Sequence, residues 1–135
     1  YSCFANGGYY RAPTLMKGII DENGDTVQKV KLPQQYRIFN SKTAEKIDLF
    51  LESVVTNGNG SKAFSPLSAN RGKTATAQSG WYENGREINH TWFCGYFTAK
   101  EKTYVVAIFK EDGISGAEDC APVFKEISEN IIDLG

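Results

Sequence analysis

The sequence has few of the residues that build metal sites. It contains one histidine, one methionine and three cysteines, and Cys3, Cys94 and Cys120 lie far apart without a Cys-x-x-Cys pair. Zinc sites need a full set of closely spaced Cys or His ligands, so the sequence argues against a metal centre. An odd number of cysteines cannot all pair within one chain, and we expect these three to be small core residues.

Long apolar runs and a surplus of charge of one sign are also missing. No window approaches the roughly 20 apolar residues of a membrane span, and the first residues do not resemble a secretory signal. Fifteen basic residues against sixteen acidic ones give a net charge of -1, without a basic cluster, so nucleic acid is not an expected partner. The composition, 41% hydrophobic and 23% charged, predicts one folded domain over residues 1–135.

The first 40 residues predict a helix end followed by a hairpin. Residues 1–5 are aromatic and small, and the pair Gly7-Gly8 is typical of a left-handed helix exit. We therefore expect the chain to begin in the last turn of a helix whose earlier part lies upstream. Residues 16–32 form two short apolar stretches around 21–25 (Asp-Glu-Asn-Gly-Asp), which indicates a small hairpin.

The middle of the chain predicts one amphipathic helix and a loop. Ser41 is the expected cap of this helix, and Asn57-Gly58 is its expected end. Apolar residues recur at helical spacing at Ala44, Ile47, Phe50, Leu51, Val54 and Val55. On the same pattern Lys46, Asp48 and Glu52 point away from the core. The small, polar stretch 60–70 indicates a surface loop.

The second half predicts an antiparallel meander and a final helix. Strand patterns cover 72–78, 89–97 and 103–110, with turns at Asn84-Gly85 and within 98–102. The apolar run 104–109 predicts a strand covered on both faces. Asp119 is the expected cap of the last helix, whose expected core face consists of Cys120, Val123, Phe124, Ile127 and Ile131. The predicted class is α+β, an antiparallel meander packed with helices.

Residues 72–78 (Gly-Lys-Thr-Ala-Thr-Ala-Gln) carry the chemistry of the chain. Alternation along a strand places Lys73 and Ala75 on one face and Thr74 and Thr76 on the other. Small residues let another chain approach, so an edge strand of this kind can accept an extended peptide while the cation and the hydroxyls bind a carboxylate. The triplet Lys-Thr-Ala by itself also fits a plain solvent-facing strand.

The order of several segments gives this triplet more weight. These segments are 4–8 (Phe-Ala-Asn-Gly-Gly), 54–58 (Val-Val-Thr-Asn-Gly), 72–78, 89–96 (Asn-His-Thr-Trp-Phe-Cys-Gly-Tyr) and 121–124 (Ala-Pro-Val-Phe). Together they resemble the C-terminal part of penicillin-binding protein transpeptidase domains, and the resemblance spans essentially the whole chain. In that family Ser-x-x-Lys, Ser-x-Asn and Lys-Thr-Gly motifs build the site.

The resemblance implies a role for each residue of the third motif. Lys73 supplies a positive field and holds the serine of the second motif, while the Thr74 and Thr76 hydroxyls bind the carboxylate of a stem peptide or a β-lactam. The Thr76 backbone N–H is one oxyanion-hole donor, and the substrate-binding stretch extends through Ala75 to Gln78. Ala75 replaces the usual glycine, which narrows the site without removing a backbone donor. No cofactor is implied.

Other parts of the family pattern are missing. No serine in the chain begins a Ser-x-x-Lys motif, so we expect no nucleophile within these residues. Residues 68–70 (Ser-Ala-Asn) match Ser-x-Asn but lie too close to Lys73, and we interpret them as a loop. His90 is expected to be structural at the start of a strand, and Trp81 and Tyr82 are expected at the rim of the cleft.

The resemblance thus predicts part of a serine D,D-transpeptidase that cross-links peptidoglycan stem peptides and binds β-lactams. The intact protein would act at the extracytoplasmic face of a bacterial membrane, through an anchor outside this chain. Two alternatives remain: a non-catalytic fragment or peptide-binding module of the same fold, and a β-lactamase or β-lactam sensor. Apolar surface uncovered by truncation also predicts a homo-oligomer.

Overall fold

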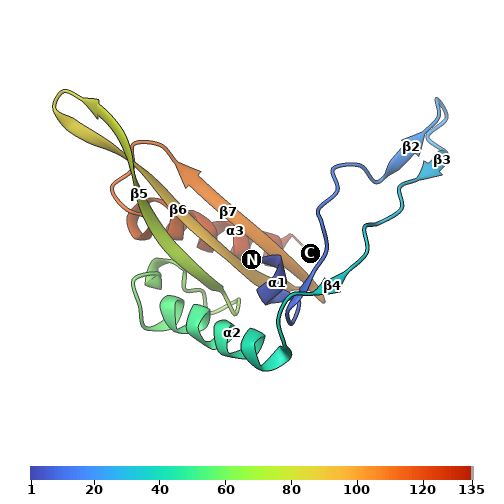
Figure 1. Ribbon diagram of the computed structural model, residues 1–135, viewed down its shortest axis with the longest axis horizontal. Helices are drawn as coiled ribbons and strands as arrows, with labels where there is room; N and C mark the ends of the chain where they lie inside the picture. Colours follow the sequence, from blue (N-terminus) through green and yellow to red (C-terminus); the bar gives the residue numbers. More distant parts are fainter. Residues whose placement is uncertain (135) are drawn as a thin grey trace.

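The body of the protein is a three-stranded antiparallel sheet flanked by helices, and a long arm projects from it (Figure 1). The computed structural model describes residues 1–134. The sheet has the order β5-β6-β7, formed by Arg71–Glu83, Arg86–Ala99 and Lys102–Lys110. Helices α2 (Ser41–Thr56) and α3 (Ala121–Asp133) pack against it. The predicted α+β meander is confirmed.

The strands run further than the sequence pattern indicates, because two tight turns join them. Asn84 and Gly85 have φ angles of 52° and 79°, the left-handed pair of a type I′ turn, as their sequence predicted. Lys100 and Glu101 adopt φ angles of 50° and 61° without any glycine or asparagine. The second turn therefore lies within the predicted range 98–102, but no residue there marks its position.

The core lies between one face of the sheet and α3. The ring of Phe124 lies 4.8 Å from that of Phe93 and 5.9 Å from that of Phe97, and all three side chains are fully buried. Cys120 is also buried, which agrees with the predicted helix face, whereas Val123 is 41% exposed. The assignment of Val123 to the core was wrong because it precedes Phe124 by one position, about 100° around the helix.

Strand β7 is covered on one face only within the described residues. Val106 and Ile108 pack against the core, whereas Val105 and Phe109 are 45% and 43% exposed. The prediction of cover on both faces was therefore wrong for this strand. Helix α3 covers only the Val106 face, and an unbroken apolar run gave no sign that the opposite face stays open.

Helix α2 begins at its predicted cap, Ser41, and is capped one residue earlier than predicted. Asn40 is the cap, since its side-chain Oδ1 accepts the Thr43 N–H at 2.9 Å, and Ser41 is the first helical residue. Asn57 ends the helix as predicted. The buried residues of α2 are Ala44, Leu51 and Val55.

Two predictions for the faces of α2 were wrong. Phe50, expected in the core, is 70% exposed. Asp48 and Glu52, expected to point away, instead bind a side chain of the sheet. The helix lies beside the start of β5 (Figure 1), where its Asp48 and Glu52 side chains meet Arg71, so its contact face includes polar residues.

The segment between α2 and β5 is partly buried, contrary to the predicted surface loop. It contains a short 3₁₀ turn, η1 (Ser61–Ala63), with Ala63 fully buried. Asn70 is 3% exposed, and its Nδ2 donates to the Ala63 carbonyl at 2.7 Å and to Ser128 Oγ at 2.9 Å. This segment links α3 to the start of β5, a contact that its small, polar sequence does not signal.

The chain opens with α1 (Ser2–Ala5), whose C-cap Asn6 is followed by Gly7 and Gly8 with φ angles of 60° and 91°. The predicted left-handed exit is confirmed. Two short antiparallel pairs follow and build the arm, namely β1 (Tyr9–Tyr10) with β4 (Tyr36–Arg37) and β2 (Gly18–Ile20) with β3 (Thr26–Lys29). The second pair is the predicted hairpin.

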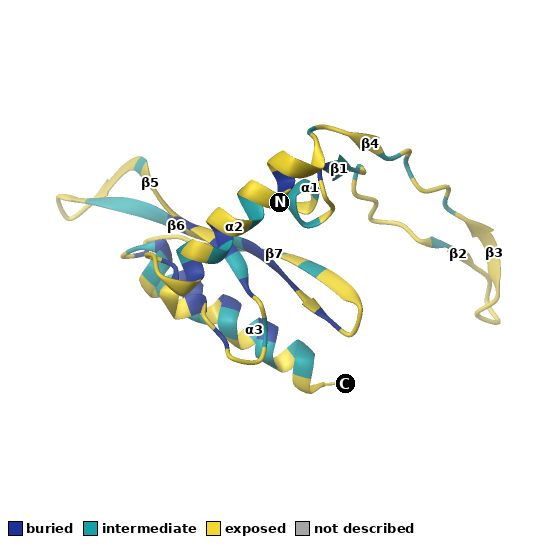
Figure 2. Cartoon of the chain, turned by 90° about the horizontal axis from the view of Figure 1, so that it is seen from below, coloured by how far each residue is buried: buried dark blue, intermediate teal, exposed yellow. Residues whose placement is uncertain are grey.

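The arm is almost entirely exposed along its length (Figure 2). Leu15, Ile20 and Val27 are among its large apolar side chains that face solvent. The association of copies through exposed apolar surface stays a prediction. All three cysteines are free, with Cys120 buried and Cys3 and Cys94 partly exposed, so the expectation of three core cysteines holds only for Cys120.

Candidate active-site strand

An open pocket of about 260 Å³ lies beside β5 and brings together Lys73, Thr74, Ala75 and Thr76. Among the described residues β5 pairs only with β6, so it is an edge strand as predicted. The opposite wall consists of Asn59, Ser115, Gly116 and Ala117. These four come from the segments that follow α2 and β7, and sequence reasoning missed all of them.

The side chains of this strand alternate as predicted. Lys73 lies opposite Cys94 and Ala75 opposite Trp92, so their side chains share one face of the sheet. Thr74 and Thr76 lie on the other face, where Thr74 is 7% exposed. Thr76 and Ala75 are exposed. The methyl group of Ala75, where the resemblance leads one to expect glycine, is therefore accommodated without burial.

The lysine bends across the free edge of the strand. Lys73 Nζ donates to the Thr74 carbonyl at 2.8 Å and lies 3.3 Å from Thr74 Oγ1. The Thr74 carbonyl therefore points to the open edge of β5, where Lys73 Nζ can bind it. Because backbone groups in an antiparallel strand alternate in direction, the N–H and C=O of Thr76 face the same edge. The edge therefore presents an ammonium group, a hydroxyl and an N–H donor within four residues.

The far wall of the pocket touches β5 through backbone atoms. The Gly116 N–H donates to Thr76 Oγ1 at 3.4 Å. A Cβ atom at Gly116 would lie 2.1 Å from the Trp92 carbonyl oxygen and 2.7 Å from that of Ala75, so only glycine permits this approach. In this hydrogen bond the Thr76 hydroxyl oxygen is the acceptor, so the hydroxyl proton of Thr76 can still be donated to a ligand.

Asp119 organises the loop that carries this wall. Its Oδ2 accepts the N–H groups of Ile114 at 2.7 Å and Ser115 at 2.9 Å, and its Oδ1 accepts from Lys110 Nζ at 2.5 Å. The prediction that Asp119 caps the last helix was wrong. Ser115 caps the π-helical turn η2 (Gly116–Cys120) that precedes α3, and Asp119 binds backward to the loop.

This arrangement predicts an acid-dependent loss of stability. The hydrogen bond from Lys110, and then those from Ser115 and Ile114, lower the pKa of Asp119 despite an opposing effect of burial. A lowered carboxyl pKa stabilises the fold above the unfolded value of about 4 and loses that stabilisation as the pH falls through the folded pKa. We expect Asp119→Asn to be less stable than the unmodified protein at pH 7.

Urea unfolding at pH 7 and at pH 3, followed by circular dichroism, measures this difference. The gap between the two proteins should narrow at pH 3, because this pH lies below the unfolded-state pKa of about 4, where the stabilisation from the ionised carboxylate is being lost. Glu111→Gln is the matched control, since Glu111 is a neighbouring exposed carboxylate. An equal gap at both pH values would contradict the assignment.

The remaining predicted residues lie away from the pocket. Gln78 donates its Nε2 to Glu87 Oε2 at 2.8 Å and does not line the pocket. His90 lies within β6 rather than at its start, with its ring 5.2 Å from that of Phe109 and 6.5 Å from that of Trp81. Its Nδ1 is buried without a partner in the described residues. The packing agrees with a structural role for His90.

Two other expectations concern the surroundings of the strand. Trp81 and Tyr82 are 68% and 70% exposed, and neither lines the pocket beside Lys73. Ser68 Oγ donates to Asn70 Oδ1 at 2.6 Å within the loop, away from the pocket, which agrees with the interpretation of 68–70 as a loop. No helix within residues 1–134 is long and apolar enough to cross a membrane.

Comparison with known proteins gives consistent results. The chain is 28% identical to a peptidoglycan D,D-transpeptidase FtsI homolog from Mesostigma viride, in an alignment that covers 99% of this chain. It is 32% identical to a peptidoglycan D,D-transpeptidase FtsI homolog from Chlorokybus atmophyticus, in an alignment that covers 75% of this chain. It spans only 25% and 16% of these relatives.

Solved structures have the same fold. A peptidoglycan synthetase from Bifidobacterium adolescentis matches 98% of this chain and 25% of its own, with a TM-score of 0.81 at 18% identity. The transpeptidase domain of an FtsI4 D,D-transpeptidase from Legionella pneumophila matches 98% of this chain and 43% of its own, with a TM-score of 0.65 at 25% identity. The family model for the penicillin binding protein transpeptidase domain matches residues 1–129, and the chain therefore belongs to that family.

Proposed function

We propose that the free edge of β5 is the docking edge for stem peptides and β-lactams in a peptidoglycan D,D-transpeptidase. The observation that carries the proposal is the arrangement of Lys73, Thr74 and Thr76 around one open pocket on an edge strand. An extended peptide can add to such an edge through its backbone, and the cation and hydroxyls can bind its terminal carboxylate.

Each residue then has a defined role. The Lys73 ammonium group attracts the substrate carboxylate and leaves its contact with the Thr74 carbonyl when a ligand or a partner serine arrives. Thr76 donates its hydroxyl proton to the carboxylate, and its backbone N–H stabilises the oxyanion. Thr74 is nearly buried, so its hydroxyl supports Lys73 more than it reaches the ligand. Gln78 lies outside the pocket, further along the same strand, and in this proposal it faces the part of an extended ligand that continues beyond the pocket.

The nucleophile in this proposal is a serine that is not one of the 135 residues, because none of their serines begins a Ser-x-x-Lys motif. Its oxygen attacks the acyl carbon of the donor stem peptide and forms an ester. The terminal D-residue leaves as an amine that carries the proton, and the amine of a second stem peptide then displaces the serine. The chain supplies docking and oxyanion stabilisation to both steps.

This proposal predicts that the chain alone forms no covalent adduct with penicillin. After incubation with a fluorescent penicillin and denaturing electrophoresis, the 135-residue protein should carry no label, whereas an intact penicillin-binding transpeptidase with its own Ser-x-x-Lys serine, treated in parallel, should be labelled. Acylation needs an activated hydroxyl, and no serine here has a lysine three positions on. A labelled band that survives denaturation would refute the assignment of the nucleophile to another part of the protein.

Two wider points belong to the same proposal. The name shared by the relatives from Mesostigma viride and Chlorokybus atmophyticus favours a transpeptidase of the FtsI type, which suggests action in cell division. We propose that residues 1–135 form one domain unit and that the intact protein acts at the extracytoplasmic face of a membrane, with peptidoglycan stem peptides as partners.

A further inference from the structure

Arg71 is held in a network of polar contacts at the start of β5, two residues before Lys73. Its Nε lies 2.9 Å and 3.0 Å from the two carboxylate oxygens of Asp48, and its Nη2 lies 3.1 Å from Glu52 Oε2. Its Nη1 donates to the Ala69 carbonyl at 2.9 Å. The Arg71 side chain is 19% exposed. All three guanidinium nitrogens therefore have partners, and two of those partners belong to α2.

Tyr96 extends the network to the second strand. It lies directly opposite Arg71 in β6, is 5% exposed, and donates its hydroxyl to Asp48 Oδ1 at 2.6 Å. Burial, and then the hydrogen bond to Asp48, raise the pKa of Tyr96, so the hydroxyl keeps its proton and remains a donor. One carboxylate on α2 thus holds the facing residues of two strands.

Besides the close contacts of Gly72 with the Phe93 ring and of Gly116 with the Ala75 backbone, the strand that follows has few side chains that fix its register. Residues 72–77 are Gly-Lys-Thr-Ala-Thr-Ala, and of their side chains only that of Thr74 is buried. Register is weakly specified in strands that bury few apolar side chains, and a slip of one residue would turn Lys73 to the opposite face. The substrate-docking edge would then lose its cation.

The hairpin turn cannot supply this register either. The ladder between β5 and β6 is irregular between Gln78 and Tyr82, and Gly80 in that stretch has a φ angle of 75°. A bulge separates the pairing on its two sides, so the turn at Asn84-Gly85 does not determine the pairing of residues 73–76. The Arg71 network lies on the side of the bulge that carries the pocket.

We propose that Arg71, held by Asp48 and Tyr96, is a positioning residue that sets the register of Lys73 to Thr76 for ligand docking. The register itself is a property of the chain, whereas its effect on ligands rests on the proposed function. A partly buried, hydrogen-bonded ion pair is suited to such a role, because it can contribute specificity of arrangement even where it adds little net stability.

The test compares Arg71→Met with Arg86→Met by nuclear magnetic resonance. Arg86 also pairs with an aspartate, Asp112, but lies in the same sheet beyond the bulge. Arg71→Met should lose the cross-strand contacts of Lys73 with Cys94 and of Thr74 with Phe93, or show a second set of signals for residues 72–77. Arg86→Met should keep both contacts. Retention of the native register in Arg71→Met would overturn the proposal.

Tyr96→Phe separates a change of register from general unfolding, because it removes one hydroxyl group and keeps the buried aromatic ring. It should show the same second set of signals at a lower population, and a fully native spectrum would count against the network. Arg71→Lys keeps the positive charge but lacks the several planar N–H donors of the guanidinium group. Compared with Arg71→Met, it should therefore recover the native register only in part.

A titration with acetyl-D-alanyl-D-alanine separates the two proposals. If the unmodified chain binds, Arg71→Met should bind about tenfold more weakly or worse, since small misplacements of binding groups are costly, and equal affinity would overturn the positioning role. If the unmodified chain does not bind, the docking role of β5 fails, while the register measurements still decide whether Arg71 positions the strand.

Discussion

Replacement of Lys73 by methionine should weaken binding of acetyl-D-alanyl-D-alanine by about 10- to 100-fold, since a charge-assisted hydrogen bond contributes about 1.5–3 kcal/mol. Within residues 1–134 the Lys73 ammonium group forms hydrogen bonds only with its neighbour Thr74. Its removal therefore costs the ligand a cation but costs the fold little. Isothermal titration calorimetry measures the loss, and urea unfolding should show nearly unchanged stability.

Lys125→Met is the control for this loss. Lys125 lies on α3, and its ammonium group is 3.9 Å from the Glu129 carboxylate on the helix surface. Its replacement removes the same charge from the whole molecule without touching β5. Equal weakening by both variants would mean that the ligand responds to net charge, and the docking role of Lys73 would then be wrong. Raised salt concentration should weaken binding to the unmodified chain more than to Lys73→Met.

The position of Lys73 is the part of the site that the sequence could predict. Side chains in a strand alternate, so the pattern of residues 72–78 was enough to place Lys73 and Ala75 on one face and Thr74 and Thr76 on the other. The turn at Asn84-Gly85 was equally readable, because few residues adopt two left-handed angles in succession. Both signals are local in the chain.

The far wall of the pocket could not be predicted for the opposite reason. Asn59, Ser115 and Gly116 meet β5 only after α2 and the loop beyond β7 fold back on the sheet. Nothing in the neighbours of Gly116 shows that its Cα will lie against the backbone of Ala75. Long-range contacts of this kind leave no periodic pattern, and only the close approach explains why glycine is needed there.

Asp48 shows how a correct helix can still be misread. The apolar spacing located α2 well, yet it assigned Asp48 to the solvent because hydropathy treats every carboxylate as outward-facing. The side chain instead accepts hydrogen bonds from Arg71 and Tyr96 of the sheet. A charged residue can lie on the contact face when its partners lie there too, and those partners are 23 and 48 positions away.

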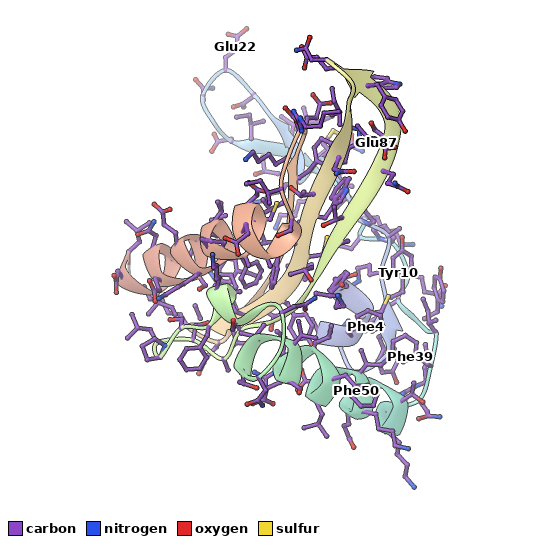
Figure 3. The ribbon with its side chains drawn as sticks, turned by 90° about the vertical axis from the view of Figure 1, so that its left-hand side faces the viewer. Phe4, Tyr10, Glu22, Phe39, Phe50 and Glu87 are labelled. Atoms are coloured by element: carbon purple, nitrogen blue, oxygen red, sulfur yellow. The ribbon has the colours of Figure 1, made fainter. Side chains whose placement is uncertain are left out.

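The largest stability loss is expected for Phe124→Ala. Phe124 is fully buried, and its ring contacts Phe93 and Phe97, so it joins α3 to the sheet (Figure 3 shows the side chains between these elements). Removal of a buried phenylalanine side chain costs about 3–5 kcal/mol. A domain of this size is stabilised by about 5–15 kcal/mol, so the variant should be near the limit of folding.

Val123→Ala is the control that tests whether the stability loss is confined to the core face of α3. Val123 is adjacent in sequence but 41% exposed, and its replacement should change the free energy of unfolding by about 0.5 kcal/mol or less. Urea unfolding followed by circular dichroism gives both values. Similar losses for the two variants would mean that α3 is rotated from the orientation described here. Since Gly116, which donates to Thr76, belongs to η2 directly before α3, that rotation would also displace the pocket beside Lys73.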